Sequence, residues 1–335
     1  MRFWGIGLII IIIAGLGWWN GNNGKIETGV NLTPEKVLVE QLPEQAILKM
    51  REREYPASDI LIDETLPDGA NYKRFIAHYK SDGLKIYGLF TVPKTEKPIG
   101  GFPAVVFVHG HLEPTIYKTT ERYVAYQDRI ARAGFVTFKP DLRGHGKSEG
   151  KSVNSNFSPG YVIDALNLVS ALGKYPEVDP DKIGMWGHSM GGGITLRAMT
   201  VNPKIKAGVI WAGVVGDWQD LIERYRKRIP WMNGPSGSSA SAFLEKYGSP
   251  SAEVTFWNTT DAYNYLKDLG GPIQLHHGTA DDSVPVEFSR HLHEAMEMAG
   301  KTSELYEYPG GDHNISGANF TRAMDRTVEF FKRIL

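Results

Sequence analysis

Short apolar runs alternate with segments of helical periodicity between residues 104 and 299. The first run, Ala104–Val108, is apolar at every position, as expected of a strand that is buried on both faces of a sheet. The predicted strands are Ala104–Val108, Phe135–Phe138, Ile183–Trp186, Ala207–Trp211 and Ile273–Leu275, and the predicted helices are Thr120–Ala133, Tyr161–Leu172, Met190–Thr200 and Val286–Ala299. This alternation indicates an α/β fold with a mostly parallel central sheet and helices on both faces.

A different pattern precedes these elements. Tyr72–Tyr79 and Leu84–Val92 alternate apolar and polar residues around Ser81-Asp82-Gly83, which predicts an antiparallel N-terminal hairpin. Residues 20–71 start with a Gly/Asn-rich stretch and continue with helical spacing over residues 31–55. We expect them to form a tether and an N-terminal helical lead.

One long segment interrupts the alternation before the last of these strands. It has about 60 residues, more than a single connecting helix needs, and it is rich in aromatic side chains. We expect a helical cap insertion at about 214–266 within a domain that spans residues 72–335. Trp218 and Trp231 are its candidate substrate-binding residues. The alternative is a structural insertion that packs on the domain without touching substrate.

The first residues indicate contact with a membrane. Arg2 precedes Phe3–Trp19, a run without charged side chains that is at the short limit for crossing a hydrocarbon core of about 30 Å. Residues 1–19 are therefore interpreted as a signal anchor or a cleaved signal peptide. The rest of the chain is then membrane-anchored outside the cytoplasm, or secreted. The alternative is a buried core helix.

Composition excludes several classes of function. The chain has 37 basic and 38 acidic residues, and no basic run that would neutralise nucleic-acid phosphates. It has no cysteine, which excludes disulfides, a thiolate nucleophile and Cys-ligated zinc.

Gly187-His188-Ser189-Met190-Gly191 follows a predicted strand and precedes a predicted helix. A tight strand-to-helix turn of this kind presents a serine hydroxyl above the sheet, and the glycines leave room for it. Ser189 is therefore the candidate nucleophile. The backbone N–H of Met190 then faces the reacting carbonyl at a helix N-terminus, where developing negative charge is favoured.

His109-Gly110-His111 follows another predicted strand. The N–H of His111 is the candidate second donor of an oxyanion hole, in which each donor contributes about 10²–10³ in rate. We expect the His109 and His111 side chains to be structural rather than catalytic bases.

His313 is the better candidate base because it lies between a predicted strand, Ser303–Tyr308, and the last helix. A serine nucleophile also needs a carboxylate that fixes the tautomer of its histidine. Asp281 is the candidate, with Asp282 and Asp312 as neighbouring alternatives. The chain order Ser, Asp, His is the order found in α/β-hydrolases.

These motifs resemble the α/β-hydrolase superfamily, in particular its prolyl-oligopeptidase-like (peptidase S9 type) and dienelactone-hydrolase-like esterase branches. The resemblance covers Tyr72–Leu335 and includes Asp141–Ser148, which looks like a structural loop of the superfamily. It implies a serine hydrolase that acts on a small ester or peptide by acyl transfer, with no metal or organic cofactor.

Two departures favour a carboxylic-ester hydrolase. S9-type peptidases usually carry a β-propeller, for which the residues before Tyr72 are too few, and commonly have an aromatic residue where this chain has Met190. An S9-type aminopeptidase or oligopeptidase stays open as the alternative, with Asp220 or Glu223 as the candidate anchor for an amino terminus; the other interpretation of these two residues is that they are surface residues. An acyltransferase stays open as well, and so does a catalytically idle, membrane-tethered binding protein.

Overall fold

The computed structural model describes residues 39–153, 155–156, 158–228, 238–251 and 255–335. The strands are β1 Leu61–Leu66, β2 Tyr72–Ser81, β3 Leu84–Pro93, β4 Phe102–Val108, β5 Val136–Pro140, β6 Val178–His188, β7 Ala207–Trp211, β8 Ile273–Gly278 and β9 Ser303–Tyr308. The α-helices are α2 Ile47–Glu52, α3 Val124–Arg132, α4 Gly160–Lys174, α5 Met190–Val201, α6 Ser238–Tyr247, α7 Thr255–Thr260, α8 Glu287–Met298 and α9 Ala318–Ile334. Short helices of other types are η1 Pro114–Ile116, η2 Asp220–Arg224, η3 Arg226–Arg228 and η6 Ala262–Asp268.

The strands of this described part form one nine-stranded sheet in the order β1-β2-β3-β5-β4-β6-β7-β8-β9. Pairing is antiparallel from β1 to β5 and parallel from β5 to β9. The predicted α/β-hydrolase fold, with its mostly parallel sheet and antiparallel hairpin, is confirmed. Because β4, β6 and β8 run in one direction, the loops that follow them emerge at the same edge of the sheet.

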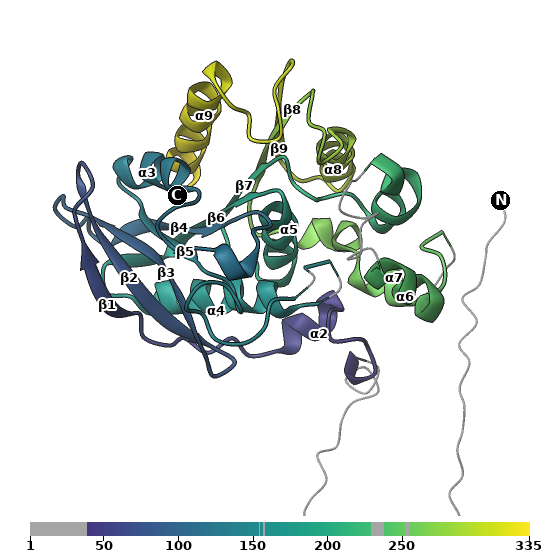
Figure 1. Cartoon of the computed structure of the whole chain (residues 1–335), viewed down its shortest axis with the longest axis horizontal. Helices are drawn as coiled ribbons and strands as arrows, with labels where there is room; N and C mark the ends of the chain where they lie inside the picture. Colours follow the sequence, from purple (N-terminus) through teal and green to yellow (C-terminus); the bar gives the residue numbers. More distant parts are fainter. Residues whose placement is uncertain (1–38, 154, 157, 229–237, 252–254) are drawn as a thin grey trace, which may run out of the picture.

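Each face of the sheet has its own apolar core. α4, α5 and α8 pack on one face over the larger hydrophobic cluster. α3 and α9 contact each other on the opposite face over a second cluster, above the central strands in Figure 1. In that second cluster the rings of Phe107 and Trp186 stack with their centroids 4.1 Å apart, which joins the ends of β4 and β6.

Most predicted strands and helices match to within a few residues, and three elements differ more. β1 is not predicted at all, because as an edge strand it is almost entirely exposed and carries no apolar pattern. β6 begins at Val178 rather than Ile183, since residues 179–182 are mostly exposed and leave no apolar run. α3 begins at Val124 rather than Thr120, because Tyr123 adopts a left-handed backbone conformation with φ +62° and ends the preceding turn.

The insertion between β7 and β8 contains η2, η3, α6, α7 and η6. Its α7 contacts α2, so part of the N-terminal lead packs against the insertion. The expected anchor or signal, residues 1–19, lies outside the described residues. Among the helices that are described, none is both long and apolar enough to cross a bilayer.

Candidate active site

Ser189 occupies the single-residue turn between β6 and α5. Its backbone has φ +54° and ψ −119°, a combination that L-residues rarely adopt. Gly187 allows this turn to close, because a Cβ there would lie 2.2 Å from the carbonyl oxygen of Gly191. The local sequence therefore forces a sharp elbow that sets Ser189 at the carboxyl end of β6.

Backbone hydrogen bonds hold this strained residue in place. The N–H of Ser189 donates to the carbonyl of Trp211 at 2.9 Å. Its carbonyl accepts from Gly192 N–H at 2.9 Å and from Val214 N–H at 3.0 Å. Strand β7, the loop after it and helix α5 thus all fix the elbow.

His313 and Asp281 are brought together by the loops after β9 and β8. Nδ1 of His313 donates to Oδ2 of Asp281 at 2.7 Å. The two neighbouring carboxylates are exposed and have different partners: Asp282 accepts from the Ser283 hydroxyl, and Asp312 from the Ser316 N–H. Among the three aspartates, Asp281 is the one in hydrogen-bonding contact with His313.

The carboxylate of Asp281 is anchored on both oxygens. Oδ1 accepts from the N–H groups of Ser283 at 2.8 Å and Val284 at 2.9 Å. Nε2 of His277 lies 3.2 Å from Oδ2. Burial by itself would raise the pKa of Asp281, but the hydrogen bonds from His277 and His313 outweigh it and hold the pKa well below its usual range.

The candidate oxyanion loop, residues 109–111, approaches the elbow closely. A Cβ on Gly110 would lie 3.3 Å from Cβ of Ser189 and 2.4 Å from the Tyr123 hydroxyl, so glycine is required there. Met190 is the first residue of α5, so its N–H is one that the helix itself leaves unpaired. The His111 side chain is exposed, whereas His109 is buried and burial lowers its pKa to about 3. A histidine in that state stays neutral.

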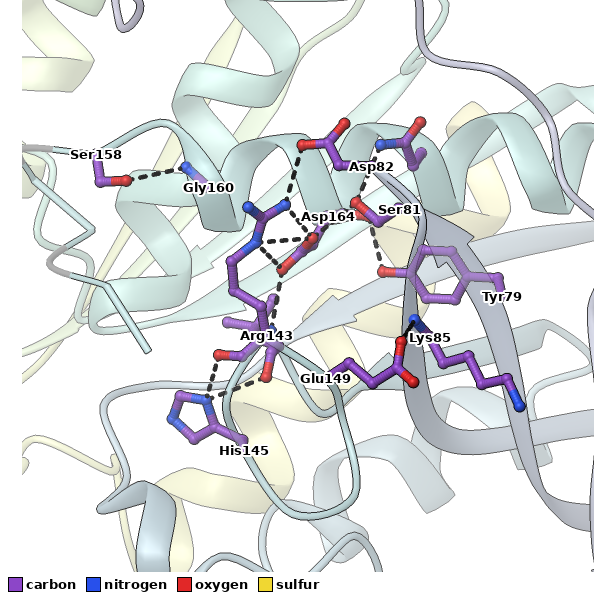
Figure 2. Close-up of polar contacts among 12 residues, drawn as sticks. Tyr79, Ser81, Asp82, Lys85, Arg143, His145, Glu149, Ser158, Gly160 and Asp164 are labelled. Atoms are coloured by element: carbon purple, nitrogen blue, oxygen red, sulfur yellow. Dashed lines mark hydrogen bonds and ion pairs between the residues drawn. The ribbon is translucent and has the colours of Figure 1, made fainter. Parts of the chain in front are cut away.

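The Asp141–Ser148 segment is held by a buried ion pair, drawn in Figure 2. The Asp164 side chain, in α4, has no exposed surface and accepts from the Arg143 guanidinium and the Ser81 hydroxyl, each at 2.7 Å. Burial raises the pKa of Asp164, although Arg143 opposes the shift. These contacts join the loop after β5 to α4 and to the β2–β3 hairpin.

A cavity of about 50 Å³ lies along one side of α5. Met190 and Ile194 from α5, together with Trp218 and Leu221 from the insertion, form apolar parts of its lining. Met190 directly follows the candidate nucleophile in the chain, and Ser189 itself is not among the residues that line the cavity. Its volume has room for a group of only a few heavy atoms.

Trp218 is a core residue rather than an exposed wall. Its side chain is buried, its indole N–H donates to the Thr260 hydroxyl at 3.0 Å, and its ring meets the edge of Trp257 at 5.2 Å. It still contributes to the cavity lining. The second expected substrate-binding residue, Trp231, lies outside the described residues.

Polar residues line another part of the same cavity. The Arg197 guanidinium donates to the carbonyl of Thr260 at 2.7 Å, and burial lowers its pKa to about 10. Asp261 accepts from the N–H groups of Tyr263 at 3.0 Å and Trp218 at 3.2 Å, and burial raises its pKa to about 6. These groups bond mainly to backbone and so fix the walls of the cavity.

The two candidate anchors for a peptide amino terminus are both engaged. Asp220 is buried and binds Arg224 at 2.7 Å with one oxygen and His291 at 2.6 Å with the second. Glu223 accepts from the Ser249 hydroxyl and from the Ser251 N–H. In the part of the chain that is described, no group of three or more metal-ligating side chains could hold a metal ion.

Comparison with known proteins identifies the family. The model of the prolyl oligopeptidase family, peptidase S9, matches residues 122–335. The chain belongs to the prolyl oligopeptidase family. It is therefore a serine hydrolase of the α/β-hydrolase superfamily, as the sequence motifs predict.

Relatives in this family differ in length. The chain is 25% identical to the uncharacterized peptidase YtmA of Bacillus subtilis over 258 residues, which cover 76% of this chain and 91% of YtmA. It is 23% identical to dipeptidyl-aminopeptidase B of Aspergillus niger over 299 residues, 84% of this chain but only 30% of that protein. The whole activity of the longer relative therefore does not transfer to this chain.

Solved structures show the same fold. Acetyl xylan esterase 1 from Thermoanaerobacterium sp. superimposes with a TM-score of 0.64 and 19% sequence identity, over 90% of this chain and 99% of the esterase. At this level of identity the likeness concerns the fold alone.

Proposed function

We propose that this serine hydrolase is a carboxylic-ester hydrolase in which Ser189, His313 and Asp281 carry out acyl transfer. The observation that carries the proposal is the hydrogen bond from His313 to the buried Asp281, in loops that emerge at the same edge of the sheet as the Ser189 elbow. This combination supports a nucleophile, a base and an orienting carboxylate at one place.

The proposed reaction has two steps. Because Nδ1 of His313 donates to Asp281, Nε2 is the nitrogen that accepts the proton of the Ser189 hydroxyl. The serine oxygen attacks the ester carbonyl, and the N–H groups of Met190 and His111 stabilise the oxyanion. His313 then protonates the leaving alcohol. In the second step His313 activates water, which releases the acid from Ser189.

The cavity beside Met190 supports an ester with a short acyl group. Its volume of about 50 Å³ accommodates an acetyl-sized group. Both carboxylate oxygens of Asp220 are already bound, to Arg224 and to His291. This counts against Asp220 as the carboxylate that would bind a peptide amino terminus.

The second candidate function is a serine peptidase. It is favoured by the description of YtmA as a peptidase, since this chain covers 91% of that protein. The two functions share the proposed chemistry and differ in the leaving group, an amine instead of an alcohol.

Active-site labelling tests the nucleophile. Wild type should react with a fluorophosphonate probe, and Ser189→Ala should lose both labelling and turnover, with turnover falling on the order of 10⁶-fold. Ser283→Ala is the matched control because this serine lies in the loop of Asp281 and should leave labelling intact. Persistent labelling of Ser189→Ala would assign the nucleophile to a different serine.

A substrate comparison tests the leaving group. We expect kcat/KM to be highest for p-nitrophenyl acetate, lower for the butyrate and octanoate esters, and lower still for aminoacyl-p-nitroanilides. Efficient cleavage of an aminoacyl-p-nitroanilide, with negligible turnover of all esters, would replace the esterase proposal by the peptidase.

A further inference from the structure

Tyr123 contacts two segments of the active site through its single hydroxyl group. The hydroxyl oxygen accepts a hydrogen bond from Gly110 N–H at 3.0 Å. The same oxygen lies 2.7 Å from Nδ1 of His188, the residue before the nucleophile. Tyr123 itself precedes helix α3 and has a left-handed backbone conformation. One side chain therefore joins the oxyanion loop to the elbow.

His188 extends this connection to the third segment. Its Nε2 lies 2.9 Å from the backbone carbonyl oxygen of His313. The rings of these two histidines are also in contact, with centroids 4.6 Å apart. The elbow is thus hydrogen-bonded both to the oxyanion loop, through Tyr123, and directly to the loop that carries the candidate base.

The direction of every proton in this chain of hydrogen bonds is determined. A carbonyl oxygen only accepts, so Nε2 of His188 carries the hydrogen. Burial, and the proximity of His313, lower the pKa of His188 to about 3, so the ring is neutral and its Nδ1 accepts. The Tyr123 hydroxyl then donates to Nδ1 and accepts from Gly110.

Packing prevents these groups from moving apart. The Tyr123 ring meets Phe107 at 6.0 Å and Trp186 at 6.2 Å, both in edge-on geometry. A Cβ on Gly110 would lie 2.4 Å from the Tyr123 hydroxyl and 3.1 Å from Nδ1 of His188. The oxyanion loop therefore rests directly on the two hydrogen-bonded side chains.

We propose that Tyr123 and His188 are positioning residues for acyl transfer, which hold the oxyanion loop and the His313 backbone at fixed places relative to Ser189. The proposal rests on the proposed roles of Ser189, His313 and the oxyanion donors. It adds two residues that act through Gly110 and the His313 carbonyl rather than on substrate. A small displacement of such groups reduces the rate more than it reduces substrate binding.

Tyr123→Phe tests the proposal because it keeps the ring and removes only the hydroxyl. We expect kcat to fall about 10- to 100-fold, which is at most the effect of a group misplaced by about 1 Å and less than the loss of an oxyanion donor. KM should stay within about twofold, since the variant keeps the interactions that bind substrate and transition state equally. The inhibition constant of a boronic acid, which mimics the tetrahedral intermediate, should rise by the same factor as kcat/KM falls.

The matched control is Tyr79→Phe. Tyr79 is also buried, and its hydroxyl donates to the carbonyl of Asp164 at 2.8 Å, away from the three active-site segments. This variant should lose stability to a similar extent and keep wild-type kcat, KM and boronic-acid inhibition.

A double-mutant cycle tests the connection to His188. His188→Gln retains a side-chain donor for the His313 carbonyl and loses the imidazole acceptor. Because both residues act through one chain of hydrogen bonds, the double variant with Tyr123→Phe should be no slower than the slower single variant. Additive losses would show independent roles and overturn the proposal.

Two further results would overturn it. The first is an unchanged kcat in Tyr123→Phe. The second is a Tyr123→Phe variant that has a lower melting temperature but is inhibited by the boronic acid as strongly as wild type. The comparison holds for whichever ester or amide the enzyme turns over, so it is independent of the esterase proposal. Loss of activity in Ser189→Ala tests the nucleophile separately.

Discussion

The carboxylate of Asp281 lies 2.7 Å from Nδ1 of His313, and none of the Asp281 side chain is exposed to solvent. A buried carboxylate at this distance fixes the tautomer of the imidazole and stabilises its protonated form during the reaction. The neighbouring Asp282 carboxylate bonds to Ser283 instead and is exposed.

Asp281→Asn should therefore lower kcat on the order of 10⁴-fold, because an amide favours the wrong tautomer of His313. Asp282→Asn is the matched control, and its kcat should stay within a few-fold of wild type. Steady-state hydrolysis of p-nitrophenyl acetate measures both. A large loss in Asp282→Asn and a small one in Asp281→Asn would assign the acid to Asp282.

Buried neutral histidines should make the protein unstable in acid. Burial lowers the pKa of His109, His188 and His276 to about 3 in the folded state, well below the unfolded value. Between these values each of the three histidines binds a proton in the unfolded state but not in the folded state, so their contribution to the free energy of unfolding falls as the pH falls from about 6.5 towards 3. Each histidine contributes about 1.4 kcal/mol per pH unit in that window.

Urea unfolding at several pH values between 7.5 and 4.5 measures this slope. His276→Gln should make the slope shallower by about one proton. A slope in His276→Gln equal to that of wild type would contradict the prediction.

The ion pair of Arg143 with Asp164 should be important for stability. Arg143→Ala leaves the Asp164 carboxylate buried without its charged partner, which costs about 3–5 kcal/mol of unfolding free energy. Lys94→Ala breaks an exposed ion pair with Asp68 and should cost less than about 1 kcal/mol. Urea unfolding of the two variants compares the effects, and equal small losses would be inconsistent with a structural role for Arg143.

The size of the cavity should determine the acyl preference. Leu221→Ala removes part of the lining and should shift the ratio of kcat/KM for butyrate over acetate upward by about tenfold, the effect expected of one or two methylene groups. Leu266→Ala is the control, since Leu266 is buried in the same core and does not line the cavity. If both variants keep the wild-type ratio, the acyl group binds elsewhere.

We propose that residues 1–19 attach the enzyme to a membrane, because Arg2 precedes the uncharged run Phe3–Trp19. Full-length protein should sediment with membranes and resist carbonate extraction. A truncated variant that begins at Asn22 should be soluble and retain activity. Recovery of a soluble form that has lost residues 1–19 from the native host would instead establish a cleaved signal.

The central strands could be predicted because each is buried on both faces and leaves a continuous apolar run, as in β4. The Ser189 elbow could be predicted because a sharp turn between strand and helix requires glycines at fixed spacing. β1 leaves no such signal, since nearly all of its residues are exposed. The site roles of Ser189, His313 and Asp281 stay predictions, although the structure brings the last two into hydrogen-bonding contact.

The connection between Tyr123 and His188 could not be predicted from sequence. The two residues are 65 positions apart, and a hydroxyl-to-imidazole bond leaves no periodic pattern. The local signal is limited to the place of His188 beside the nucleophile. The helical pattern places Tyr123 in the interior of a helix, because a left-handed backbone is uncommon for a residue other than glycine and leaves no mark in the pattern.

The backbone of Ser189 has a consequence for how this sequence changes over generations. A glycine would adopt φ +54° and ψ −119° with less strain than serine. The substitution Ser189→Gly should therefore stabilise the folded state. With Ser189 as the proposed nucleophile, selection for turnover opposes this substitution. A lineage that no longer needed the reaction should therefore lose its hydroxyl first at Ser189, and the inactive descendants would be expected to fold at least as well as the enzyme.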